Sequence, residues 1–83
     1  MEIIFTNHAE NVITERNILK EWVVYVIYNP VKTENDKIDT SLIHNLGKIQ
    51  ERGDRILRVI RSKESTPVKV VTTYFDRNQK RKL

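Results

Sequence analysis

The chain has 83 residues, 39% of them hydrophobic and 31% charged, which is typical of one small folded domain and excludes a disordered or low-complexity protein. It has no cysteine and only two histidines, far apart in the sequence, so we expect no disulfide, no metal site and no cofactor. The formal net charge of +4 divides into −3 over residues 1–41 and +7 over residues 42–83, so we expect the second half to meet any polyanion.

No apolar run approaches the roughly 20 residues that a membrane-spanning helix needs. The first residues also lack the basic and then apolar layout of a secretory signal peptide. We therefore expect a cytoplasmic protein with no membrane partner.

A short strand followed by a helix is expected at the start of the chain. Residues 2–6 are rich in Ile and Phe, which favour a strand. Asn7 suits an N-cap and Glu10 its capping-box partner, which predicts a helix beginning at His8. At about 100° per residue, the buried arc of this helix contains Ala9, Val12 and Ile13. Arg16 falls in the middle of that arc, and a cation among core positions needs a partner.

The next segment, residues 20–28, is ambiguous between a strand and a helix. Its β-branched and aromatic residues favour a strand, yet apolar residues also repeat at helical spacing. Asn29 and Pro30 end the element in either case, because proline disfavours the helical region for the residue before it. Residues 31–41 are polar enough to predict a loop, with room for one short strand at residues 31–33.

A hairpin is expected in the second half of the chain. The pair that begins at Gly53 predicts a two-residue loop between strands over residues 47–52 and 55–62. That loop length would place Lys48 directly opposite Val59.

The second strand of the hairpin has two faces of similar character. Arg58 alternates with Ile56 and Ile60, while Leu57 and Val59 lie on the other face. The sequence therefore leaves open which face is the core. If Leu57 and Val59 are inside, Arg58 belongs to an open cleft.

The last predicted strand covers residues 68–75, and residues 76–83 form a basic tail that we expect to be frayed. Simple alternation places Thr72 and Tyr74 on one face of this strand, together with Val68 and Val70. The other histidine, His44, has no partner that the sequence identifies, so we expect it to be exposed.

Several pieces of the chain occur in an order typical of one family. They are Thr6-x-His8-Ala9, Arg16 at the end of the first helix, Asn29-Pro30, a hairpin, and Val70-Val71-Thr72-x-Tyr74. In these pieces the chain resembles the domain of unknown function 4258 family, small prokaryotic proteins grouped with RelE-type and barnase-like ribonuclease folds and often linked to toxin–antitoxin systems. The resemblance covers nearly the whole chain, and it implies that residues 20–28 form a second helix.

With that helix, the expected fold is a single α+β domain over residues 1–83. It has a short N-terminal strand, two helices and an antiparallel sheet, in meander order, whose one face packs on the helices. The open face would carry the site.

The resemblance implies a metal-independent endoribonuclease of the toxin type, which cleaves RNA, free or on the ribosome, and has an antitoxin protein as partner. Such cleavage needs a base, cations for the charge on the phosphate, and an acid. We expect His8 to act as base or phosphate ligand, Arg16 and Arg58 to bind the phosphate, and Tyr74 to be the acid. Further contacts to RNA are expected from Lys48, Arg55, Arg61 and Thr72.

Each candidate also has a structural explanation. His8 can simply hydrogen-bond near the helix start, and Arg16 can interact with the negative end of the helix dipole. Tyr74 can pack among the valines of its strand with its hydroxyl at the rim, and Thr72 suits a strand by shape alone.

Two alternatives to the enzyme stay open. Family members resembling this chain have an arginine four residues after the histidine, where this chain has Val12, so a candidate catalytic cation is missing. The first alternative is therefore a non-catalytic module that binds RNA or an acidic protein with the same basic face. The second is an interaction protein that assembles through an exposed edge strand.

Overall fold

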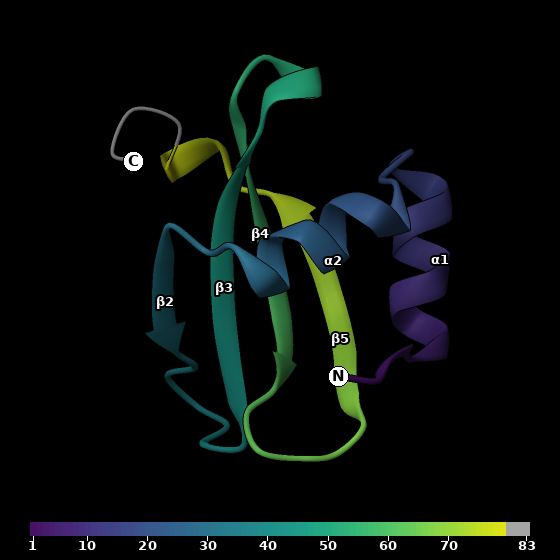
Figure 1. The fold of residues 1–83 in the computed structure, drawn as a ribbon, viewed down its shortest axis with the longest axis vertical. Coiled ribbons are helices and arrows are strands. Elements are labelled where there is room, and N and C mark those ends of the chain that lie inside the picture. The colour runs from purple at the N-terminus through teal and green to yellow at the C-terminus, as the bar shows by residue number, and fades with distance from the viewer. Residues whose placement is uncertain (80–83) are drawn as a thin grey trace.

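The computed structural model describes residues 1–79 of the chain and has an α+β fold, as expected (Figure 1). A five-stranded sheet has the order β1-β5-β4-β3-β2. The strands are β1 (Ile3–Phe5), β2 (Lys32–Asn35), β3 (Leu42–Ile49), β4 (Arg55–Ser62) and β5 (Val68–Phe75), the helices are α1 (Asn7–Glu15) and α2 (Lys20–Tyr28), and two short 3₁₀ turns are η1 (Gln50–Arg52) and η2 (Arg77–Gln79). All strand pairs are antiparallel except β1 with β5, which are parallel. Of the predicted frayed tail, residues 80–83 lie outside the described part of the chain.

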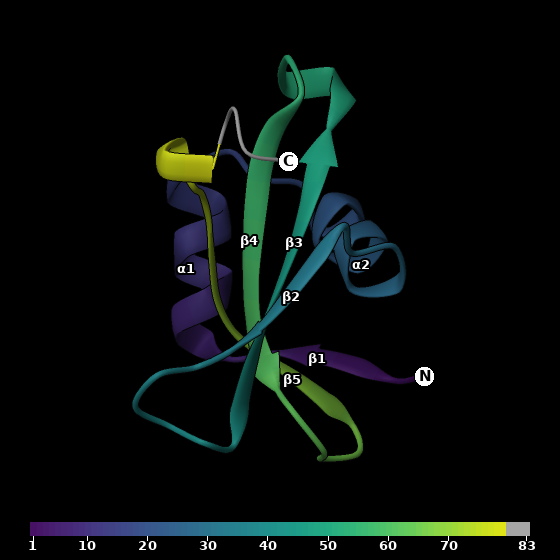
Figure 2. The same ribbon diagram turned by 90° about the vertical axis from the view of Figure 1, so that its left-hand side faces the viewer.

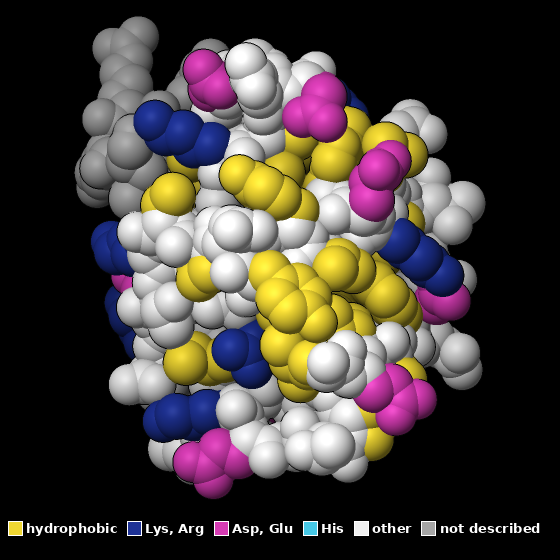
Figure 3. Space-filling view, viewed as in Figure 1, with side chains coloured by type: hydrophobic (Ala, Val, Ile, Leu, Met, Phe, Trp, Pro, Cys, Tyr) yellow, Lys and Arg dark blue, Asp and Glu magenta, His cyan; other side chains and the backbone are white. Residues whose placement is uncertain are grey.

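The sheet is strongly twisted, and the helices pack on different strands. In Figure 2, β1 runs nearly across the direction of β3 and β4, and β5 bends along its length. Helix α2 contacts β3 and β4, whereas α1 contacts β5 and β1. Hydrophobic side chains gather on the outer surface over α2 (Figure 3), where Tyr25 and Tyr28 are each about half exposed.

Helix α1 begins one residue earlier than the sequence predicts. Thr6, not Asn7, is the N-cap, and its Oγ1 accepts a hydrogen bond from the backbone N–H of Ala9 at 3.1 Å. The same hydroxyl donates to the carbonyl of Val71 at 3.2 Å, and the Thr6 N–H donates to that of Val70 at 3.0 Å. Thr6 and Asn7 are both suitable N-cap residues, and the hydrogen bonds of Thr6 to β5 make Thr6 the cap. The predicted buried residues of this helix are confirmed: Ala9, Val12 and Ile13.

Residues 20–28 form a helix, as the resemblance implies and against their strand propensity. Four apolar side chains of α2 are buried in the core. At Gly47 of β3 the helix comes so close that a Cβ atom would lie 2.9 Å from Cγ2 of Val26. Packing of this apolar stripe outweighs the local preference of its β-branched residues.

The core lies on the Leu57 and Val59 face of β4, so the question left open by the sequence is answered. Both residues are fully buried, together with Ile49 and Val70. Arg58 therefore lies on the opposite face of the sheet.

The predicted two-residue hairpin loop is wrong. Residues 50–54 connect β3 and β4, with η1 followed by Gly53 at φ 69° and Asp54 at φ 60°. Arg58 consequently pairs with Leu46, and Val59 pairs with Asn45 instead of Lys48. The longer turn shifts the register by an odd number of residues. Each side chain of β3 therefore lies on the opposite face of the sheet, relative to the side chains of β4, from the one that the two-residue loop predicts.

A β-bulge in β5 corrects the prediction for the last strand. Ile60 pairs with Thr72 but Arg61 pairs with Val70, so Val71 has no partner directly opposite. The alternation of side chains changes at this residue. Tyr74 therefore lies directly opposite Arg58 and on its face, whereas Val68 and Val70 are buried.

Candidate functional site

An open cleft of about 360 Å³ lies where β5 ends and β4 begins. Its lining is almost entirely cationic and aromatic. The lining residues are Arg16, Arg52, Arg55, Tyr74, Phe75 and Arg77, and we call this the arginine cleft.

Separate elements supply the four arginines of this cleft. Arg16 is the C-cap residue of α1, and Arg52 is the last residue of η1. Arg55 opens β4, and Arg77 opens η2. Each arginine thus lies at an element end, where a long side chain can extend over the edge of the sheet.

Aromatic rings hold two of the guanidinium groups. The Cζ of Arg55 lies 4.5 Å from the ring centroid of Phe75, and that of Arg52 lies 5.0 Å from it. The Arg52 guanidinium is also 5.6 Å from the Trp22 ring, which meets Phe75 edge-on with centroids 6.2 Å apart. Cation–π contact with rings anchored in the core orients these cations without neutralising them.

The cleft cations have no carboxylate partner among residues 1–79. The ion pairs found there involve Lys20, Lys32 and Arg58, and none of the four cleft arginines. Arg16 donates to the Thr73 carbonyl at 3.5 Å, and Arg52 to the Asn17 carbonyl at 3.3 Å. Most of the guanidinium N–H donors in the cleft therefore stay available to an anion.

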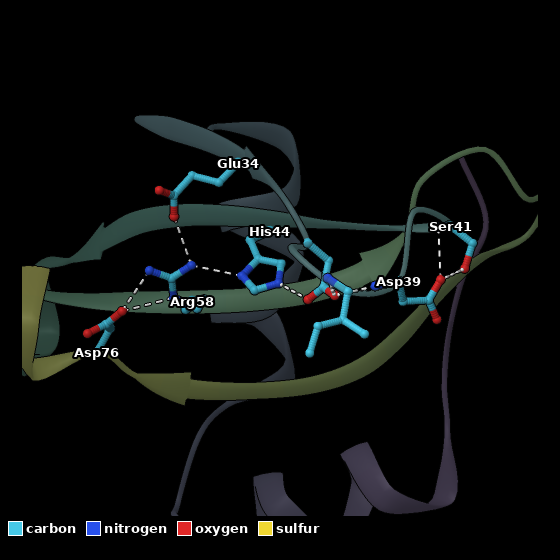
Figure 4. Close-up of polar contacts among 8 residues, drawn as sticks. Glu34, Asp39, Ser41, His44, Arg58 and Asp76 are labelled. Carbon is cyan, nitrogen blue, oxygen red and sulfur yellow. Dashed lines mark hydrogen bonds and ion pairs between the residues drawn. The ribbon is translucent and has the colours of Figure 1, made fainter.

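Arg58, in contrast, is buried on the open face of the sheet, and each of its three side-chain nitrogens has a partner (Figure 4). Its Nε and Nη2 donate to Oδ2 of Asp76 at 2.9 and 2.8 Å. Its Nη1 donates to Oε1 of Glu34 at 2.9 Å and to Nδ1 of His44 at 2.8 Å. Burial lowers the pKa of Arg58, but the hydrogen bonds to Asp76 and Glu34 outweigh it and raise the pKa overall. The geometry offers Arg58 no free fork for a phosphate.

His44 extends this network and is not exposed as expected. Its side chain is 14% exposed, and its Nε2 lies 2.7 Å from Oδ1 of Asp36. A guanidinium can only donate, so Nδ1 is the acceptor and Nε2 carries the hydrogen. Backbone N–H groups of Asp39 and Ile38, with His44, lower the pKa of Asp36 to about 2. Both nitrogens of His44 are thus occupied.

His8 does not join the arginine cleft. It is exposed in the first turn of α1, whereas Arg16 caps the other end of that helix. At a rise of about 1.5 Å per residue, their Cα atoms lie about 12 Å apart along the helix axis.

Three other predicted contact residues also lie elsewhere. Arg61 donates to Oδ1 of Asn45 at 2.6 Å, and burial lowers its pKa. Thr72 is half-buried opposite Ile60 and is not among the residues that line the cleft. Lys48 is exposed and lines a different cavity, between α2 and β3.

The structure therefore brings together three of the predicted residues, Arg16, Arg55 and Tyr74. Sequence reasoning missed Arg52 and Arg77, which lie in the same cleft. The available signal was that each is a basic residue next to the end of a predicted strand.

The fold and the site define a small α+β protein with a cationic cleft that suits a polyanion. By sequence comparison, the chain belongs to the family described as "Domain of unknown function (DUF4258)", which matches residues 5–75. This confirms the family that the motifs indicated, and all cleft residues except Arg77 lie within the match. No curated protein and no solved structure matches the chain. Within residues 1–79, no helix is long and apolar enough to cross a membrane.

Proposed function

We propose that this protein binds RNA through the arginine cleft. The observation that carries the proposal is a set of four guanidinium groups, gathered in one cleft without a carboxylate partner among the described residues. Like charges brought this close repel one another, so a ligand with negative charge stabilises the arrangement. Each guanidinium presents a planar fork that fits two oxygens of a phosphate.

The charge distribution and the family support RNA as the polyanion. Three of the four arginines come from the half of the chain that carries a net charge of +7. The grouping of this family with RelE-type and barnase-like ribonuclease folds, which the resemblance implies, favours RNA as the substrate class and the cytoplasm as the place of action. An antitoxin protein with an acidic segment would compete for the same four guanidinium groups.

Binding of a fluorescent single-stranded RNA oligonucleotide, followed by anisotropy over a range of salt concentrations, tests the proposal. Arg55→Ala should weaken binding and reduce the slope of log affinity against log salt by about 0.7, the value for one phosphate contact in a single strand. Lys63→Ala removes one exposed positive charge outside the cleft and serves as the matched control. Equal effects of the two substitutions would contradict a specific role for the cleft.

Cleavage of the bound RNA is the second candidate function. It is favoured by the position of Tyr74, which lines the same cleft as Arg16 and Arg55. The phenol O–H can donate a proton to the leaving 5′-oxygen while the arginines stabilise the charge on the phosphate. Binding is better supported than cleavage, because the described lining of the cleft includes no imidazole or carboxylate to act as base.

Incubation of labelled RNA with the protein in the presence of a chelator decides between the two functions. If the protein is a metal-independent ribonuclease, Tyr74→Phe should slow cleavage by about 10² to 10⁴, the usual contribution of a general acid, and leave RNA affinity unchanged. Salt-sensitive binding without cleavage by the wild-type protein would establish the binding module instead.

A further inference from the structure

We propose that Arg58 is a positioning residue for the arginine cleft: it holds Asp76, and through Asp76 the turn that carries Arg77. This inference rests on the proposed function, because it concerns how one of the RNA-binding cations is kept in place. It also gives Arg58 a role different from the direct phosphate contact that the sequence suggested.

The pair of Arg58 and Asp76 is buried and geometrically well defined. Both side chains are 10% exposed, and two nitrogens of Arg58 donate to the same oxygen, Oδ2 of Asp76 (Figure 4). Burial excludes most of the water that would otherwise solvate these charges. Each charge therefore depends on the other for its hydrogen bonds.

The other oxygen of Asp76 holds the turn. Its Oδ1 accepts a hydrogen bond from the backbone N–H of Asn78 at 3.0 Å, and its carbonyl accepts one from Gln79 at 3.3 Å. Its own N–H donates to the Ile56 carbonyl of β4 at 2.8 Å. One carboxylate thus links the guanidinium on β4 to η2, whose first residue, Arg77, lines the arginine cleft.

Arg58 acts through Asp76 because its guanidinium has little left to offer a ligand. Nη1 donates hydrogen bonds to Glu34 and His44, while Nε and Nη2 donate to Asp76. A phosphate would have to displace a buried carboxylate to reach it. Arg77 is exposed, and it has no carboxylate partner among residues 1–79.

Asp76→Asn separates a positioning role from a simple electrostatic one, because the two predict opposite changes in RNA affinity. Arg58 and the Asn78 N–H donate to different oxygens of Asp76, and in Asn one of those two positions becomes an NH2 group that cannot accept, so one of the two contacts is lost. The substitution also removes a negative charge beside the cleft, which by electrostatics alone would tighten RNA binding. We expect weaker binding instead, by about fivefold near 0.1 M salt, with the salt slope reduced by about 0.7, the value for one lost phosphate contact in a single strand.

The second test asks whether the effects of Asp76→Asn and Arg77→Ala on RNA affinity depend on each other. If Asp76 acts by holding Arg77, the double variant Asp76→Asn with Arg77→Ala should bind RNA no more weakly than Arg77→Ala alone. Glu34→Gln is the matched control, since it weakens the other ion pair of Arg58 at the end away from η2, and it should leave RNA affinity unchanged.

A milder variant covers the case in which Asp76→Asn does not fold, as judged by thermal unfolding. Arg58→Lys keeps the charge but cannot donate from two nitrogens to Asp76. It should reduce the hydrogen-exchange protection of the Asn78 amide and lower RNA affinity in the same direction.

Two outcomes keep the inference and the proposed function apart. Unchanged or tighter RNA binding by Asp76→Asn, together with a normal defect in Arg55→Ala, would overturn the positioning role and leave the RNA site intact. If Arg55→Ala has no effect on RNA binding, the proposed function itself fails.

Discussion

At the scale of single residues, the environment decides what a charged side chain can do. Arg58 and Arg55 belong to the same strand, but the first is surrounded by Glu34, Asp76 and His44 and the second lies against a phenylalanine ring. A guanidinium that is saturated by carboxylates stabilises structure, whereas one held by an aromatic ring keeps its donors for a ligand. Of the two histidines, His44 has both ring nitrogens occupied by Asp36 and Arg58, whereas His8 is exposed.

The low pKa of Asp36 makes a prediction about stability and pH. Its pKa falls from the ordinary 3.8 to about 2 in the folded protein, so its ionised form stabilises the fold. This contribution is fully present above about pH 4 and is lost as the pH falls towards 2. Urea unfolding should therefore show that Asp36→Asn is less stable than wild type at neutral pH. The difference should shrink between pH 4 and 2, and a constant difference over that range would contradict this account.

At the scale of elements, close contact fixes the second helix on the sheet. Gly47 allows α2 to approach β3, because any larger residue there would meet the side chain of Val26. The bulge at Val71 in β5 acts in a similar way, since it turns Tyr74 towards the face of Arg58. Both features depend on one residue that breaks a regular pattern, and both act on the geometry of a neighbouring element.

Gly47→Ala tests the helix contact. The added methyl would lie 2.9 Å from Cγ2 of Val26, so the helix must shift, and we expect a loss of about 1 to 3 kcal/mol in the free energy of unfolding, as for other overpacked cores. Chemical denaturation measures this loss. The double variant with Val26→Ala should be more stable than the sum of the two single effects predicts, because each change offsets the other. Additive effects would show that Gly47 matters for another reason.

At the scale of the whole molecule, the arginine cleft exists only because distant segments meet. Its residues come from the end of α1, the hairpin turn, the start of β4, the end of β5 and η2. Residues 16 and 77 are 61 positions apart in the sequence, and the sheet order brings them to one cleft. The net charge of the second half indicates that a polyanion can bind, but the sheet decides where the charges gather.

The α+β class, the first helix with its buried arc, the last strand and the basic character of the second half follow from the sequence alone, because they depend on local propensity, periodicity and composition. The second helix needed the family resemblance. The hairpin register, the bulge at Val71, the partners of Arg58 and the meeting of Arg16 with Arg77 were decided only by the tertiary structure. Each of these depends on the pairing of residues far apart in the chain, where a change of one position in a turn or strand moves side chains to the other face of the sheet.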